Sequence, residues 1–136
     1  MSAEFVDTNV LVYAHDASAG AKHAKAVDLL TRLVRDEVAA ASVQVLAEFY
    51  AASTRKLRMN PEEAEEILSD LGTWTIHRPA HGDLIRASRL HRRHKLGWWD
   101  AMVVNSAIEL GCPILWTEDL DHGHRYTTVT VRNPFR

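Results

Sequence analysis

Short apolar runs alternate with longer segments of helical periodicity along the whole chain, and this alternation constrains the fold more than any other feature. Strands are predicted at residues 4–7, 38–41, 74–77, 114–117 and 127–132. Helical patterns are found at residues 10–14, 23–35, 43–55, 61–71, 83–94 and 100–110. Strands separated by helices favour a parallel sheet with helices on both faces. We therefore predict an α/β fold with a central parallel sheet of about five strands, the last of them an edge strand.

Polar residues mark where several of these helices begin. Ser42 and Asn60 are expected to cap the helices that follow them, because their side-chain oxygens can accept hydrogen bonds from free backbone N–H groups. Two further helices are each expected to be capped by one of two adjacent residues. The first helix has Thr8 or Asn9 as its candidate, and the helix at 83–94 has Gly82 or Asp83.

The size and composition of the chain exclude several classes of protein. Its 136 residues suit a single domain, 1–136, with a core that needs no covalent or metal support. Cys112 is the only cysteine, which excludes a disulfide framework and a cysteine-based zinc site. No apolar run reaches the roughly 18–20 residues that cross a bilayer. The start of the chain lacks the pattern of a signal peptide, so we expect a cytoplasmic protein that does not bind membranes.

Four acidic residues stand in apolar segments, where an unpaired charge would be costly to bury. Asp7 and Asp119 follow predicted strands, Asp100 opens a helix, and Glu48 lies one turn inside another helix. In an open parallel sheet the carboxyl ends of the strands meet at one edge, where ligands bind. The pattern therefore predicts that these side chains converge at that edge.

Converging carboxylates repel one another unless a cation neutralises them. Mg²⁺ and Mn²⁺ prefer oxygen ligands, so a set of carboxylates suits either ion better than zinc. Other interpretations of each acid remain open at this point. Asp7 and Asp100 could be helix caps that interact with the helix dipole, and Asp119 could be a turn residue. Glu48 is the hardest to explain in this way, because its helix is so apolar.

The same residues resemble the PIN-domain ribonucleases, and specifically the VapC toxins of bacterial toxin–antitoxin pairs. The resemblance covers essentially the whole chain, in the expected order. It rests on four motifs: Asp7-Thr8-Asn9, Glu48 within Gln44–Tyr50, Trp99-Asp100-Ala101, and Leu115–Leu120 with Asp119.

The resemblance implies a PIN-domain-like, Rossmann-like fold and assigns roles to particular residues. The catalytic, metal-binding acids of the family correspond to Asp7, Glu48, Asp100 and Asp119. Three further residues are expected to support that site without binding the metal: Thr8, Asn9 and Thr117. Either Glu118 or Asp121 could assist or replace the last acid, because both flank it.

The resemblance also implies an activity and partners. The expected activity is that of an endoribonuclease dependent on Mg²⁺ or Mn²⁺, in which metal-activated water hydrolyses phosphodiester bonds of RNA such as tRNA or rRNA. A homodimer and a VapB-type antitoxin partner are expected as well. The alternative is a non-catalytic PIN-like module that binds RNA or protein.

One stretch of the chain is strongly basic, although the net charge of −2 argues against a general nucleic-acid-binding coat. Residues 86–95 hold five Lys and Arg side chains and no acid. At helical spacing, Arg86, Arg89 and Arg93 share one face. This face is either simply solvated or a track of phosphate contacts that leads RNA to the acids.

Overall fold

The protein is described here by a computed structural model that covers residues 1–136. Its strands are β1 (Glu4–Val6), β2 (Ala39–Ser42), β3 (Thr75–His77), β4 (Ile114–Trp116), β5 (Arg125–Tyr126) and β6 (Val129–Arg132). Its helices are α1 (Thr8–Ala14), α2 (Ala21–Arg35), α3 (Val43–Arg55), α4 (Pro61–Leu71), α5 (His81–His94) and α6 (Trp98–Glu109), with a short 3₁₀ turn at Ala17–Ala19.

The strands form one six-stranded sheet in the order β3-β2-β1-β4-β6-β5. Every neighbouring pair is parallel except β5 and β6, which are antiparallel. The predicted α/β class and parallel sheet are therefore confirmed. The prediction that residues 127–132 form an edge strand is wrong, because β6 pairs with β4 on one side and with β5 on the other. The two-residue β5 is too short to give a periodic signal in the sequence.

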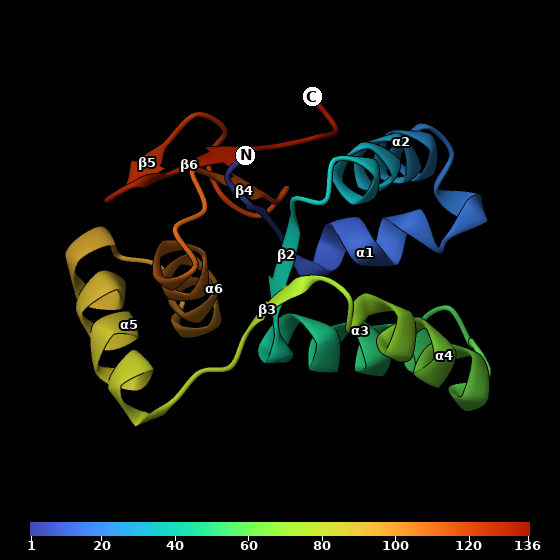
Figure 1. Cartoon of the computed structure of the whole chain (residues 1–136), viewed down its shortest axis with the longest axis horizontal. Helices are drawn as coiled ribbons and strands as arrows, with labels where there is room; N and C mark the ends of the chain where they lie inside the picture. The colour runs from blue at the N-terminus through green and yellow to red at the C-terminus, as the bar shows by residue number, and fades with distance from the viewer.

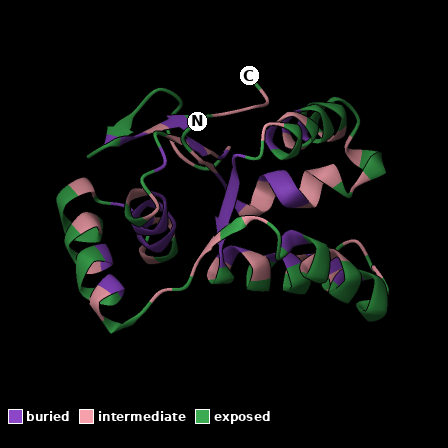
Figure 2. Ribbon diagram, viewed as in Figure 1, coloured by how far each residue is buried: buried purple, intermediate pink, exposed green.

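Helices cover both faces of the sheet, as predicted. Figure 1 shows α5 and α6 on one side and α1 and α2 on the other, with α3 and α4 packed together near the β3 end of the sheet. The core lies between these layers. Figure 2 shows the central strands and much of α6 as buried, and every residue of α6 from Ala101 to Ala107 is buried. None of the helices is long and apolar enough to span a bilayer.

Two of the four predicted caps are confirmed. The Ser42 hydroxyl accepts a hydrogen bond from the Val45 N–H, and the Asn60 side chain accepts one from the Glu62 N–H. The other two predictions are wrong. The N-cap of α1 is Asp7, which confirms the alternative interpretation of that residue as a helix cap, and it is neither Thr8 nor Asn9. Helix α5 begins at His81, two residues before the predicted start, and Asp83 accepts a hydrogen bond from the N–H of its N-cap residue, Ala80.

Candidate functional site

Asp7 is the buried centre of the candidate site, at the point where β1 ends and α1 begins. Its side chain is held from two directions. One oxygen, Oδ1, accepts a hydrogen bond from the Thr8 N–H at 2.7 Å, and Oδ2 accepts one from the Thr117 hydroxyl at 2.9 Å. Burial above all, and to a lesser extent the negative charges of Asp119 and Glu48, outweigh these hydrogen bonds and raise the pKa of the Asp7 carboxyl to about 7.

Asn9 joins the first turn of α1 to the segment that follows β4. Its Nδ2 lies 3.1 Å from both the Thr117 hydroxyl and an oxygen of Asp119, and its Oδ1 accepts a hydrogen bond from the Glu118 N–H. The Thr117 hydroxyl, which is fully buried, also accepts a hydrogen bond from the Asp119 N–H. It therefore uses one donor and two acceptor positions, the full capacity of a hydroxyl.

Glu48 reaches the site from α3. One of its oxygens accepts a hydrogen bond from the Thr8 hydroxyl at 3.1 Å, and the other accepts one from Gln44 Nε2 at 2.9 Å. The side chain is exposed. The apolar composition of α3 predicted little exposed surface for Glu48 to occupy, and this prediction is wrong: Val43 and Tyr50 are partly exposed on the same helix.

Asp100 lies in the first turn of α6 and is half-buried. Burial raises its pKa, and the negative charges of Asp119 and Glu48 raise it further. These are the same two charges that act on Asp7. The structure therefore places all four sequence-predicted acids within one electrostatic neighbourhood at the carboxyl edge of the sheet, with Asp7 buried and Glu48 and Asp119 open to solvent.

None of these four carboxylates forms an ion pair with a basic side chain. Their negative charge is therefore left uncompensated by the protein. Oxygen ligands with an excess of negative charge are the donor set of a hard divalent cation. The residues fit Mg²⁺ or Mn²⁺ in their chemistry, although no three His, Cys, Asp or Glu side chains are arranged as a ready-made metal site.

A cleft of about 580 Å³ opens beside this neighbourhood. Glu48 and Asp119 form part of its wall together with Thr8 and Asn9, and Lys56 from the segment after α3 lies on it as well. The cleft is polar, and it gives a ligand access to the two exposed acids.

The three acids in the segment after β4 differ in their surroundings. Glu118 is paired with Lys22 of α2 at 2.8 Å, whereas Asp119 is held by Asn9 and has no cation. Asp121 is exposed and makes no hydrogen bond or ion pair with the cluster. The geometry therefore favours Asp119 over both neighbours as the acid that faces Asp7.

Sequence reasoning missed two residues that shape the site. Gln44 positions Glu48, and the spacing of four residues within one helix is a signal that could have revealed it. Lys22 neutralises Glu118 across a gap of 96 residues, and no pattern in the sequence indicates that contact.

The three arginines proposed as a phosphate track line a separate cavity, between α5 and α6. They share one face, as predicted from their spacing. Arg86 forms ion pairs with Asp83 and Glu109, whereas Arg89 and Arg93 form none. The basic face is therefore not uniform: one arginine is tied into the protein and two are free.

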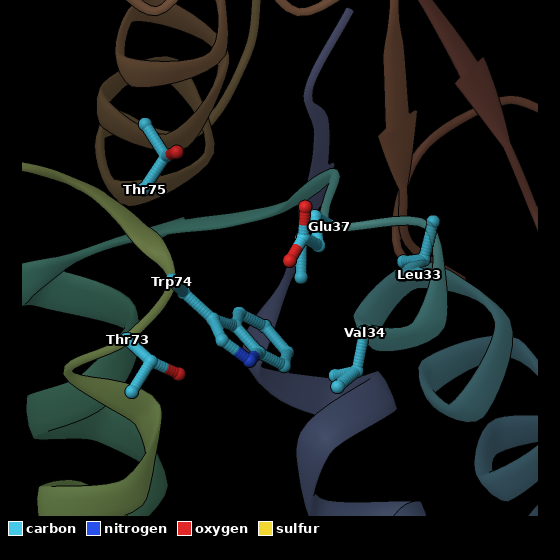
Figure 3. Close-up of a pocket in the computed structure, with 7 residues that line it drawn as sticks. Leu33, Val34, Glu37, Thr73, Trp74 and Thr75 are labelled. Atoms are coloured by element: carbon cyan, nitrogen blue, oxygen red, sulfur yellow. The ribbon is translucent and has the colours of Figure 1, made fainter. Parts of the chain in front are cut away.

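Another cavity, of about 320 Å³, lies far from this chemistry. Figure 3 shows Trp74 facing Leu33 and Val34 across it, with Glu37 as its one ionisable side chain. It has no converging polar groups of the kind that catalysis needs, and it contains none of the predicted site residues.

The chain matches a known family model and several solved structures. The family model of the PIN domain matches residues 5–126. The chain belongs to the PIN domain family. All four acids of the site lie within the matched residues. A search of curated protein sequences gives no match.

Solved structures share this PIN fold. A toxin–antitoxin complex from Klebsiella pneumoniae is 19% identical with a TM-score of 0.72, and the alignment covers 97% of this chain and 98% of the other. VapC20 of Mycobacterium tuberculosis, a Sarcin-Ricin loop cleaving toxin, is 19% identical with a TM-score of 0.67, over 83% and 87%. DNA-bound VapBC from Salmonella typhimurium is 14% identical with a TM-score of 0.69, over 98% and 99%. At these identities the likeness establishes the PIN fold.

Proposed function

We propose that this PIN-domain protein is a VapC-type toxin, an endoribonuclease that uses Mg²⁺ or Mn²⁺ to hydrolyse phosphodiester bonds of RNA. One observation carries the proposal. Burial raises the pKa values of Asp7 and Asp100, the nearby charges of Glu48 and Asp119 raise both further, and no basic side chain forms an ion pair with any of the four carboxylates. Such an arrangement is costly to the protein by itself, and a bound divalent cation would offset the cost.

The side chains that would hold the cation are Asp7, Glu48, Asp100 and Asp119. A divalent cation bound there lowers the pKa of a bound water and neutralises negative charge on the phosphate. The protein's own part is positioning. Thr117 and Asn9 fix the orientation of the Asp7 carboxyl, while Thr8 and Gln44 hold the two oxygens of Glu48. These hydrogen bonds would keep Asp7 and Glu48 oriented toward a shared cation.

The proposal includes partners as well. We propose an RNA substrate such as tRNA or rRNA, a VapB-type antitoxin and a homodimer. The structural likeness to VapC20, which cleaves the Sarcin-Ricin loop, and to VapBC complexes supports the RNA substrate and the antitoxin, whereas the homodimer follows from the family resemblance alone. Light scattering of the purified protein tests the dimer, and co-purification with an antitoxin encoded beside its gene tests the complex.

A second candidate is a PIN-like module that binds RNA or protein without cutting it. The lack of a ready-made arrangement of three metal-ligating side chains favours this alternative. Retention of all four acids argues against it, because a module that only binds has no need of a repulsive carboxylate cluster.

Incubation with total RNA separates the two candidates. Cleavage with Mg²⁺, none with EDTA, and 5′-phosphate ends at mapped positions are the expected results. The Asp7→Asn variant should be inactive. Asp28→Asn is the matched control, since Asp28 is an exposed α2 residue without hydrogen bonds or ion pairs. Equal cleavage by the Asp7→Asn variant would point to a contaminating nuclease or to a different site.

A further inference from the structure

The helix α5 concentrates positive charge on the side of the protein opposite the acidic helix α4. Five basic side chains of the segment from Arg86 to Lys95 are exposed, while α4 presents Glu62, Glu63, Glu65, Glu66 and Asp70. Figure 1 shows these two helices at opposite ends of the molecule. A polyanion is therefore attracted to the α5 end and repelled from the α4 end.

The α5 charge surrounds a cavity of about 200 Å³ between α5, α6 and the turn that joins β5 to β6. Arg89 and Arg93 line it from α5, and Thr127 lines it from the turn. This volume is several times the roughly 30 Å³ that one water molecule occupies in the liquid. A phosphate group with part of its hydration shell therefore has room there.

The charge inside this cavity is not balanced by the protein. The guanidinium of Arg86 lies 3.1 Å from an oxygen of Asp83 and 3.4 Å from an oxygen of Glu109, so these two acids are already committed to it. Arg89 and Arg93 have no acidic partner. Two unpaired guanidinium groups beside one cavity attract an anion, and the planar guanidinium fork matches phosphate oxygens in pairs.

Arg125 of β5 adds a cation next to the turn. It donates a hydrogen bond from Nε to the carbonyl of Thr127, a residue of the cavity wall, at 3.0 Å, although Arg125 itself does not line the cavity. Its neighbour Tyr126 packs edge-on against His94 at a ring-centroid distance of 5.1 Å. Burial raises the pKa of Tyr126, and the charges of Asp121 and Asp100 add to that effect. The cavity and Asp100 share α6: Asp100 lies in its first turn, and Asn105 and Glu109 line the cavity roughly 8–14 Å further along the helix axis.

We infer that Arg89 and Arg93 bind a backbone phosphate of the RNA in this cavity, away from the phosphate that is cut. The inference rests on the proposed function, because it takes RNA as the substrate. A nucleic-acid backbone repeats its phosphates, so one strand can occupy both the cavity and the acidic site. Arg86 forms part of the cavity wall and is not a phosphate contact.

The test measures RNA binding without cleavage. A fluorescein-labelled stem-loop RNA is titrated with the Asp7→Asn protein over a range of salt concentrations, and fluorescence anisotropy gives the affinity. Arg89→Gln and Arg93→Gln are each expected to weaken binding and to reduce the slope of log K against log salt by about 1. The matched control is Arg92→Gln, because Arg92 is exposed on the same helix and does not line the cavity.

The outcomes separate the inference from the proposed function. A smaller slope for Arg89→Gln and Arg93→Gln, with the slope of Arg92→Gln unchanged, supports the phosphate site. Equal losses at all three positions would mean diffuse attraction and would overturn the inference. Unchanged RNA affinity of the Arg89→Gln and Arg93→Gln variants would also overturn the inference. An acidic protein would then be the remaining candidate for the ligand of this cavity. Cleavage by the protein with native Asp7 is measured separately, so a failure there contradicts the proposed function alone.

Discussion

The Thr117 hydroxyl donates a hydrogen bond to Asp7 Oδ2 at 2.9 Å and so links the end of β4 to the end of β1. The two strands are neighbours in the sheet, and the residues that follow them are 110 positions apart in the chain. The parallel register brings both ends to one edge, and this contact helps to hold the buried carboxylate in place, together with the hydrogen bond from the Thr8 N–H.

Replacing Thr117 by valine tests this link. The variant keeps the shape of the side chain but leaves the Asp119 N–H without its partner, and leaves Asp7 Oδ2 with only the longer 3.4 Å contact from Asn9 Nδ2. Loss of a partner for buried polar groups costs about 1–3 kcal/mol, so the free energy of unfolding in urea should fall by that amount. Thr128→Val is the control, because Thr128 is exposed in the β5–β6 turn and its hydroxyl makes no hydrogen bond. Equal stability of both variants would contradict the structural role of Thr117.

The pKa of Asp7 predicts how the stability of the metal-free protein depends on pH. It is raised from 3.8 to about 7 in the folded state, so the folded protein binds this proton more tightly than the unfolded chain does. The stabilisation is fully present below pH 3.8 and is lost as the pH rises through about 7. The loss is at most ~4 kcal/mol. Denaturant unfolding in EDTA across this range measures it.

The Asp7→Asn variant should lack this loss, because asparagine carries no proton that titrates. It should therefore be more stable than the native protein in EDTA at alkaline pH, and saturating Mg²⁺ should stabilise only the native protein. The same pH dependence in both proteins would show that Asp7 is not the titrating group.

The pKa of Asp83 is shifted in the opposite direction, below its ordinary value. Burial favours a raised pKa at Asp83, but hydrogen bonds from the Ala80 N–H, Asn105 and Arg86 outweigh it and lower the pKa to about 2. Its contribution to stability is therefore present above pH 3.8 and is lost as the pH falls through about 2. Thermal unfolding in acid should show this loss in the native protein and not in Asp83→Asn.

At neutral pH, Asp83→Ala should lower the free energy of unfolding by about 1–3 kcal/mol, since Asn105 loses its partner inside the core. Asp70→Ala serves as the comparison, because the Asp70 side chain is exposed and makes no hydrogen bond or ion pair. It should change stability by less than about 0.5 kcal/mol. A similar effect of both substitutions would mean that the buried network around Asp83 contributes nothing.

The acid at the end of β4 can be identified by a pair of substitutions. Asp119→Asn removes the carboxylate that Asn9 directs toward Asp7 and should lower RNA cleavage by roughly 10–100-fold or more. Glu118→Gln removes a carboxylate already paired with Lys22 and should leave cleavage within a few-fold of the native rate. Gel-based cleavage rates at fixed Mg²⁺ measure both. A larger loss for Glu118→Gln would exchange the roles of the two residues.

The α/β class and the convergence of the acids were predictable because both depend on local patterns. Ser42 and Asn60 mark helix starts, and parallel strands must place their carboxyl ends together. The capping of α1 was mispredicted because Asp7 serves two roles, as the N-cap and as the centre of the site. Either role alone could explain an aspartate after a strand, so the sequence could not reveal that it has both.

The ion pairs of the arginines in α5 could not be fully predicted from the sequence, for a different reason. The spacing of three residues within α5 could have indicated the pair of Asp83 and Arg86, but nothing in the sequence indicates that Arg86 also pairs with Glu109 while Arg89 and Arg93 are free. That distinction arises only when α5 packs against α6. The exposure of Glu48 is likewise set by the packing of α3, and its apolar neighbours in the sequence gave the wrong expectation.

Titration of the purified protein with Mn²⁺, followed by calorimetry, tests most directly whether the carboxylate cluster binds a divalent cation. We predict saturable binding to the native protein and to Asp28→Asn, and loss of that binding in Asp7→Asn and in Asp100→Asn. No binding to the native protein, or equal binding to all four proteins, would contradict the assignment of these acids to a metal centre.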